Sequence, residues 1–152
     1  MPALQRTPCF RIRALPDWVA WYLLRYEVLR APWGQPATLP TAPGESEAIH
    51  YGIAQPDTRQ MLAGGRVLEL TEGRWQIRSM AVRAELRGQG LGREVLQALE
   101  QEARQKGGTR VMLHARENAL RFYQAAGYTL IEPSHLLFGE IQHYRMEKAL
   151  RK

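Results

Sequence analysis

Cysteine is almost absent from this sequence. Cys9 is the only one among 152 residues, so the chain cannot form an internal disulfide. No apolar run approaches the roughly 20 residues that a membrane-spanning helix requires, and residues 1–16 are too polar for a signal peptide. We therefore expect a cytoplasmic protein without a membrane partner. The length suits one domain, residues 1–152, with a hydrophobic core of its own.

The sequence also lacks the motifs that accompany metal or nucleic-acid binding. Its formal net charge is +6 and its pI is about 9.9, and a basic surface attracts anions, including nucleic acids. The basic residues are dispersed, however, and there is no zinc-ligand spacing and no RNA-binding signature. We expect no metal and no nucleic-acid partner. The least favoured alternative, a basic nucleic-acid binder, would show salt-dependent DNA binding.

Hydrophobic periodicity predicts a mixed α/β fold. One helix is expected to begin at Pro16–Asp17 and to stop before Pro32, a second to follow Gly92 and end at Gly107–Gly108, and a short third to open at Asn118. Runs of apolar or alternating residues predict strands at residues 10–15, 50–55, 61–70, 74–82, 109–114, 128–132 and 142–146.

Proline and glycine residues indicate the loops between these elements. Residues 31–45 hold four prolines and two glycines and are predicted to form a loop, while residues 134–139 are predicted to connect the last two strands. A strand, a helix and a strand over residues 74–114 indicate a right-handed crossover, so these two strands should be parallel.

The strand at residues 74–82 changes the face on which its apolar residues lie. Trp75 and Ile77 share one face, and Met80 and Val82 share the other. A β-bulge near Arg78–Ser79 would produce this change. A central strand buried on both faces would produce it too, and the pattern alone does not choose between them.

Alternate glycines precede the second helix, in the stretch Arg87-Gly-Gln-Gly-Leu-Gly-Arg93. Glycines at this spacing let the backbone present successive N–H groups to one anion, and the start of the helix adds partial positive charge. The dinucleotide fingerprint needs a different glycine spacing and a later acidic residue, and the P-loop needs Gly-Lys-Ser/Thr; neither is present. A pyrophosphate cradle and a plain glycine-rich turn both remain open.

The glycine stretch resembles the acyl-CoA loop of the GNAT superfamily of N-acetyltransferases, whose pattern is Arg/Gln-x-x-Gly-x-Gly/Ala; Arg87, Gly90 and Gly92 fill it. A second stretch is similar to the motif that follows the second parallel strand in that family. Five positions match it, and Arg116 departs from it because the family usually has asparagine there. The matching positions are Ala119, Phe122, Tyr123, Gly127 and Tyr128.

The resemblance implies a GNAT-like fold, with a mixed, mostly antiparallel sheet that is splayed in the middle and flanked by helices. It implies acetyl-CoA as co-substrate and allows a homodimer. The Tyr123 hydroxyl would protonate the departing thiolate, and a backbone N–H near Met80 or Ala81 would polarise the thioester carbonyl. The residues implied to bind acetyl-CoA are Met80, Ala81, Val82, Arg87, Gly88, Gln89, Gly90, Leu91, Gly92, Arg93, Asn118 and Tyr123.

The acceptor would be a primary amine on a small molecule or a peptide, and it must lose a proton before it attacks. The strand at residues 74–82 offers no carboxylate, so we expect His143 or Glu140 as the base, ahead of His135 and Glu69. Arg30, Trp33 and His135 are the candidates for acceptor binding. His114 is expected to pack or cap locally, Asn118 could be a plain N-cap, and Tyr123 could be a core tyrosine.

Two classes of function follow. The first is direct acetyl transfer within a ternary complex, since nothing in the sequence activates Cys9 as a nucleophile. The second is a CoA-binding sensor or an inactive partner domain, which the lack of an obvious base favours and which Tyr123 opposes. Release of free thiol from acetyl-CoA in the presence of amines distinguishes them.

Overall fold

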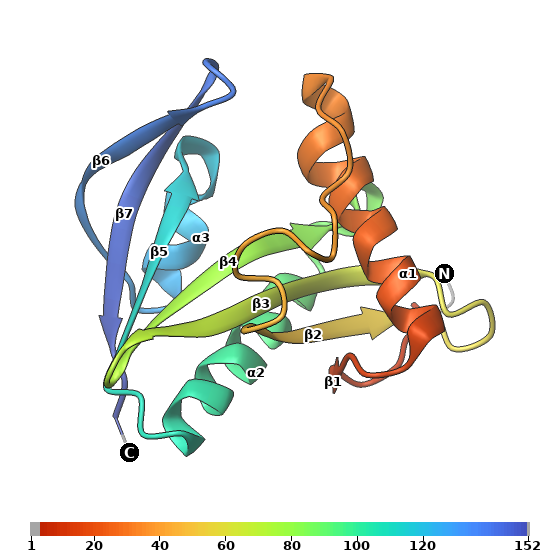
Figure 1. Cartoon of the computed structure of the whole chain (residues 1–152), viewed down its shortest axis with the longest axis horizontal. Coiled ribbons are helices and arrows are strands. Elements are labelled where there is room, and N and C mark those ends of the chain that lie inside the picture. The colour runs from red at the N-terminus through yellow and green to blue at the C-terminus, as the bar shows by residue number, and fades with distance from the viewer. Residues whose placement is uncertain (1–3, 152) are drawn as a thin grey trace. The chain divides into compact units, whose positions relative to one another are not determined.

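The computed structural model describes residues 4–151 and has the mixed α/β architecture that the periodicity predicts (Figure 1). Within that range, seven strands form one sheet in the order β1-β2-β3-β4-β5-β7-β6. The strands are β1 (Phe10–Arg11), β2 (Ile49–Ala54), β3 (Met61–Thr71), β4 (Arg74–Val82), β5 (Arg110–Arg116), β6 (Thr129–Leu137) and β7 (Ile141–Ala149). The α-helices are α1 (Leu15–Arg25), α2 (Leu91–Gln105) and α3 (Leu120–Ala125).

The first helical segment runs further than expected. The α-helix α1 ends at Arg25, but a π-helical turn, η1 (Tyr26–Arg30), and a 3₁₀ turn, η2 (Ala31–Trp33), continue it past Pro32. Pro32 lies in the first turn of η2. Backbone N–H groups in a first turn have no acceptor within the helix, so proline, which lacks this N–H, is tolerated there. The helix itself stops before Pro32, as predicted, and Gly34, with φ +68°, ends the 3₁₀ turn that follows.

Four strand predictions needed correction, the first being that β7 runs to Ala149 rather than to Met146. β1 is only two residues long, because Pro16 lies in the first turn of α1 and the helix already begins at Leu15. β5 reaches Arg116 rather than His114. β6 extends to Leu137, so the predicted connector at residues 134–139 shrinks to the turn before Ile141. β6 tolerates Pro133 because it is an edge strand with register shifts on either side of that residue.

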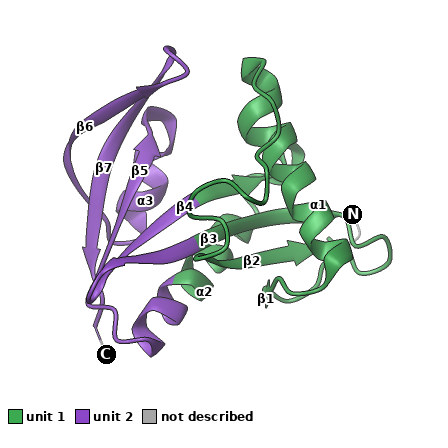
Figure 2. Cartoon of the chain, in the orientation of Figure 1, with its two compact units in different colours: residues 1–66, 79–99 green, residues 67–78, 100–152 purple. Residues whose placement is uncertain are grey.

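The chain forms two compact units (Figure 2). Unit 1 holds the described residues up to Arg66 together with Ser79–Leu99, and unit 2 holds Val67–Arg78 with the described residues from Glu100 onward. The unit boundaries fall inside β3, β4 and α2. The expectation from length that residues 1–152 act as one domain stays a prediction.

Unit 1 is centred on α1 and the strands beside it. Its core cluster consists of Ile12, Trp21, Leu24, Ala54, Met61 and Ala81, all buried. The N-terminal part of α2 packs close to β3 at Gly65. A Cβ atom there would lie 2.5 Å from Sδ of Met80 and 2.9 Å from Cδ1 of Leu99, so a larger residue would force these side chains to move.

Unit 2 contains the parallel strand pair. β4 and β5 are parallel, as predicted, and their register pairs run from Arg74 and Arg110 to Gln76 and Met112. The splay that the resemblance implies between these two strands stays a prediction. β5 pairs along its length with antiparallel β7, which in turn pairs with β6. The buried carboxylate of Glu100 accepts hydrogen bonds from Tyr128 at 2.8 Å and Lys148 at 3.0 Å and anchors the end of α2.

Candidate functional site

The glycine loop of unit 1 connects β4 to α2 by way of a 3₁₀ turn, η3 (Ala84–Leu86). Gly88 has φ +81° and Gly90 has φ +83°, conformations that residues with a Cβ atom rarely adopt. Within residues 4–151 the backbone N–H groups of Gly88, Gln89 and Gly90 have no hydrogen-bond acceptor, and all three residues are exposed. The loop thus presents free donors directly before the first turn of a 15-residue helix, as the predicted cradle requires.

The strand that leads to this loop is interrupted at Ser79. This residue has φ +57° in the middle of β4, which breaks the extended conformation where the sequence predicted a bulge. Trp75, Gln76 and Ile77 are buried in succession, so the strand is also buried on both faces before the interruption, and each of the two alternatives describes part of β4. Nε of Arg66 in β3 donates to Oγ of Ser79 at 3.1 Å and holds the interruption from one side.

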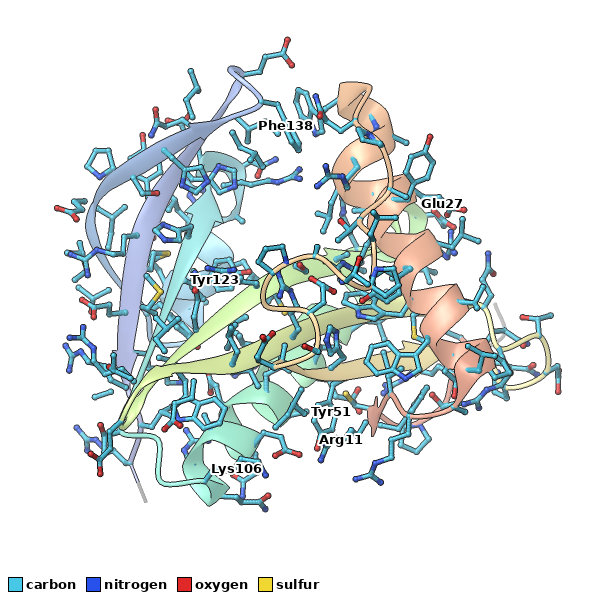
Figure 3. All side chains as sticks on the ribbon, viewed as in Figure 1. Arg11, Glu27, Tyr51, Lys106, Tyr123 and Phe138 are labelled. Atoms are coloured by element: carbon cyan, nitrogen blue, oxygen red, sulfur yellow. The ribbon has the colours of Figure 1, made fainter. Side chains whose placement is uncertain are left out.

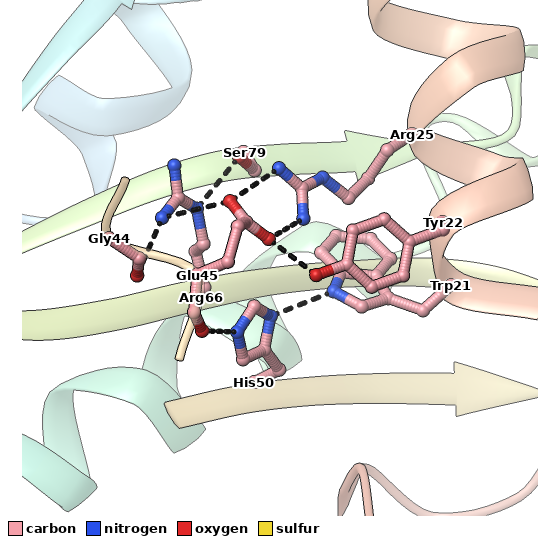
Figure 4. A network of polar contacts seen from close by, with 8 residues as sticks. All are labelled: Trp21, Tyr22, Arg25, Gly44, Glu45, His50, Arg66 and Ser79. Atoms are coloured by element: carbon pink, nitrogen blue, oxygen red, sulfur yellow. Dashed lines mark hydrogen bonds and ion pairs between the residues drawn. The ribbon is translucent and has the colours of Figure 1, made fainter. Parts of the chain in front are cut away.

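Glu45 is the centre of a buried polar network in unit 1 (Figure 4). Its carboxylate, 1% exposed, accepts hydrogen bonds from Arg25 at 2.6 and 3.0 Å and from the Tyr22 hydroxyl at 2.7 Å. Arg66 lies 3.1 Å from the second carboxylate oxygen. The network therefore fixes the end of the proline-rich loop against α1, β3 and the interruption of β4.

The same network fixes the tautomer of His50. The indole N–H of Trp21 donates to Nδ1 of His50 at 2.9 Å, so the proton of the ring lies on Nε2 and is donated to the Glu45 carbonyl at 3.0 Å. Burial lowers the pKa of His50, and the ring is neutral at pH 7. Both ring nitrogens are occupied, so His50 is a structural residue rather than an acid–base group.

Glu45 is likewise no general base. Burial by itself would raise the pKa of Glu45, but the hydrogen bonds from Arg25 and Tyr22 and the charges of Arg25 and Arg66 outweigh it and keep the pKa below its ordinary value. A carboxylate whose oxygens are shared among three donor side chains stays ionised and stabilises the fold. Sequence reasoning missed this network, because its members lie far apart in the sequence without a common spacing.

We expect Glu45→Gln to destabilise the protein by about 3 kcal/mol at pH 7, because two arginines would stay buried with less compensation. The folded pKa of Glu45 lies below the ordinary 4.5, so its contribution is present above that pH and is lost as the pH falls through the folded value. Denaturant unfolding at pH 7 and at pH 4 measures both effects. Exposed Glu47, changed to Gln, is the matched control; equal stability of the two variants would contradict the assignment.

Tyr123 lies on α3 in unit 2 (Figure 3). Its side chain is 8% exposed and packs edge-on against Phe122 and Tyr128, with ring centroids 5.0 and 5.8 Å away. Burial raises its pKa, so the hydroxyl keeps its proton at neutral pH. Asn118 is exposed in the 3₁₀ turn η4 (Glu117–Ala119), and the N-cap of α3 is Ala119, so the reading of Asn118 as its N-cap is wrong.

Three histidines from adjacent strands of unit 2 form a cluster, defined here as His114, His135 and His143. The ring centroids of His114 and His135 are 5.1 Å apart, and those of His135 and His143 are 4.6 Å apart in a stacked arrangement. Nδ1 of His143 donates to the Ile141 carbonyl at 2.9 Å, which leaves the lone pair on Nε2. Burial and the nearby positive groups lower the pKa of His143, so this ring is neutral at pH 7.

The remaining predicted residues are divided between the units. In unit 1, Arg30 donates through Nε to the Pro36 carbonyl, and Trp33 is half-buried in η2. In unit 2, Glu140 is exposed in the turn before β7, and the Glu69 carboxylate accepts the Gly73 N–H at 3.4 Å. The structure brings His135 and His143 together and adds His114, which the sequence had assigned to local packing.

Neither a metal site nor a membrane span emerges from the described part of the chain. Among residues 4–151, no three His, Cys, Asp or Glu side chains are arranged to hold a metal ion. The helices described are also too short or too polar to cross a bilayer.

Comparison with known proteins adds an independent line of evidence. The sequence profile described as "Acetyltransferase (GNAT) family" matches residues 15–128. An acyl-CoA N-acyltransferase from Pseudomonas aeruginosa is 26% identical with a TM-score of 0.76, over 97% of this chain and 100% of that one. A proposed N-acetyltransferase from Lactobacillus plantarum is 22% identical, with a TM-score of 0.80 and the same coverage. An aminoglycoside 6'-N-acetyltransferase complexed with coenzyme A is 16% identical, with a TM-score of 0.73 over 95% of this chain and 97% of that one.

Proposed function

Because the chain belongs to the GNAT family of acetyltransferases, we propose that it transfers the acetyl group of acetyl-CoA to a primary amine by direct attack. It is thus an acyltransferase of a family that uses acetyl-CoA. We propose in addition which residues bind and react, and that the amine attacks the thioester directly. The observation that carries it is the loop of unit 1, where two left-handed glycines leave three backbone N–H groups free before α2.

The loop fits the pyrophosphate of CoA. A Cβ atom built on Gly88 or Gly90 would meet nothing within 4 Å, so the space beside the backbone is open to a ligand. Arg87 and Arg93 flank the free N–H groups with positive charge, and both are exposed. We assign the pyrophosphate to residues 87–93 and the pantetheine amides to the backbone of Met80, Ala81 and Val82, with Asn118 as a further donor.

Acetyl-CoA supplies a thioester, whose carbonyl needs a hydrogen-bond donor and whose thiolate needs a proton. The N–H of Met80 or Ala81, just after the interruption at Ser79, is the proposed donor to the carbonyl. Tyr123 is the proposed acid for the thiolate, since its hydroxyl carries a proton at working pH.

Direct attack is favoured over an acyl-enzyme by the state of Cys9. Burial and the charge of Glu94 raise the pKa of this thiol to about 12, so it is protonated at neutral pH and a poor nucleophile. The acceptor amine must then attack the thioester itself, and it needs a base. Nε2 of His143, whose lone pair is free because Nδ1 is the donor, is the preferred base, and exposed Glu140 is the second.

The acceptor remains a primary amine on a small molecule or a peptide, with Arg30, Trp33 and His135 as the proposed binding residues. The test is release of free thiol from acetyl-CoA with a panel of amines, read against a control without amine. We expect at least one amine to raise thiol release well above that control. Binding of CoA by calorimetry without thiol release for any amine would favour the sensor instead.

A further inference from the structure

The histidine cluster of unit 2 has one ring nitrogen without a partner. Nδ1 of His114 is buried, and no hydrogen-bond partner for it exists among the described residues. A buried N–H without an acceptor is rarer in proteins than a buried lone pair without a donor. The favoured tautomer therefore carries its proton on Nε2, and His114 offers that N–H as a donor.

The neighbourhood of the cluster is positive. Burial lowers the pKa of His114, and the neighbouring imidazoles together with the positive charges of Arg78 and Arg145 lower it further. Arg116 has the same effect on His143. Since β5 and β7 pair antiparallel, His114 lies opposite Arg145, and Arg116 lies opposite His143, so these side chains share one face of the sheet.

The carboxylates near this face are already paired. Glu132 accepts from Arg145 at 3.2 Å, and Glu147 accepts from Arg145 at 2.9 Å and lies 3.3 Å from Arg74 and 3.4 Å from Arg110. Glu117 accepts from the Tyr144 hydroxyl at 3.3 Å. Arg78, in contrast, is exposed and makes no hydrogen bond or ion pair within the described residues. It follows Gln76 by two residues, as His114 follows Met112, the parallel pair partner of Gln76, so Arg78 and His114 lie on the same face of their strands. The charge that this face has left to offer a ligand is positive.

We propose that His114, His135 and Arg78 bind an oxyanion, a carboxylate or a phosphate, carried by the acceptor amine. An oxyanion would receive the Nε2–H of His114, a donor from the exposed ring of His135 and the planar guanidinium of Arg78. His143 stacks on His135 and positions that ring. This inference rests on the proposed function for the statement that the ligand is the acceptor, but the binding of an oxyanion can be measured by itself.

The test is a titration of the whole chain, with histidine rings labelled for NMR, against sodium acetate, sodium phosphate and sodium chloride at constant ionic strength. We expect saturable shifts of the His114 and His135 resonances with acetate or phosphate, and none with chloride. Tighter binding of acetate would point to an acceptor carboxylate, and tighter binding of phosphate to an acceptor phosphate. Equal shifts with all three salts would overturn the proposal.

Two variants test the residues. Arg78→Gln and His135→Phe should each weaken binding of the oxyanion about tenfold or more, because each removes a charged or ring N–H donor. Arg121→Gln, which removes an exposed arginine of α3, is the matched control and should leave binding unchanged. If Arg78→Gln and Arg121→Gln lose the same affinity for the oxyanion, the effect comes from the net charge of the protein, and the proposed site is wrong.

The role of the oxyanion site in acetyl transfer can be measured separately. Where amines are turned over, glycine should be a better acceptor than glycinamide if the oxyanion is a carboxylate, and Arg78→Gln should remove that preference by raising the KM for glycine. Saturable oxyanion binding without thiol release for any amine would leave the site standing and reject the proposed function. If Arg78→Gln releases thiol with wild-type KM for every anionic acceptor, the proposed function stands and the oxyanion site is rejected.

Discussion

Gly90→Val is expected to weaken binding of acetyl-CoA at least a hundredfold. Gly90 has φ +83°, a conformation that a β-branched residue does not adopt without strain, so the loop must change its path and its N–H groups no longer converge on one anion. Gly88→Val, at φ +81°, should act in the same way. Isothermal calorimetry with CoA gives the affinity directly, and it does not depend on knowledge of the acceptor.

The control for Gly90→Val is Gly107→Val. Gly107 also has φ +83°, and a Cβ atom there would also meet nothing within 4 Å, but it follows the end of α2 rather than its start. This variant should show a similar loss of thermal stability and unchanged affinity for CoA. Undiminished CoA affinity in both Gly88→Val and Gly90→Val would remove the loop from the binding site.

Tyr123→Phe is expected to lower kcat about a hundredfold with little change in affinity for acetyl-CoA. General acid catalysis contributes roughly 10²–10⁴-fold, and a thiolate is a good leaving group, so the low end applies. The phenylalanine ring keeps the edge-on packing with Phe122 and Tyr128, and the variant should therefore fold. Steady-state kinetics with the acceptor found in the thiol-release assay measures the loss.

Tyr128→Phe is the matched control for Tyr123→Phe. Tyr128 is also buried, but its hydroxyl donates to Glu100 and has a structural partner. Its replacement should reduce stability, because Glu100 loses a donor, and should leave kcat close to wild type. An unchanged kcat in Tyr123→Phe would make Tyr123 a packing residue and would assign protonation of the thiolate to water.

The local signals in the sequence predicted the backbone around the proposed acetyl-CoA loop well. The bounds of β4, the glycine turn and the helix after it follow from short-range patterns of glycine and apolar residues, while the interruption near Ser79 was one of two alternatives that the pattern left open. These patterns are readable because backbone conformation at a left-handed glycine is a local property. The parallel pairing of β4 with β5 followed from the handedness of the crossover.

The polar contacts over long distances could not be predicted. Glu45 lies in a loop rich in proline and glycine, and its partners Arg25 and Arg66 lie about twenty residues away in either direction. His114 was read as a packing residue, because only the register of β5, β6 and β7 brings it to His135. Such contacts depend on strand order and register, which a single sequence does not specify.

The interleaving of the two units has a consequence for synthesis on the ribosome. All residues of unit 1 have been translated once Leu99 is added, while Val67–Arg78 must wait for the strands and helices that follow Glu100. During that interval the hairpin tips of β3 and β4, with Trp75 and Ile77, lack β5 as a partner. A chain that is released after residue 99 should therefore expose an unpaired hydrophobic strand edge and become prone to aggregation.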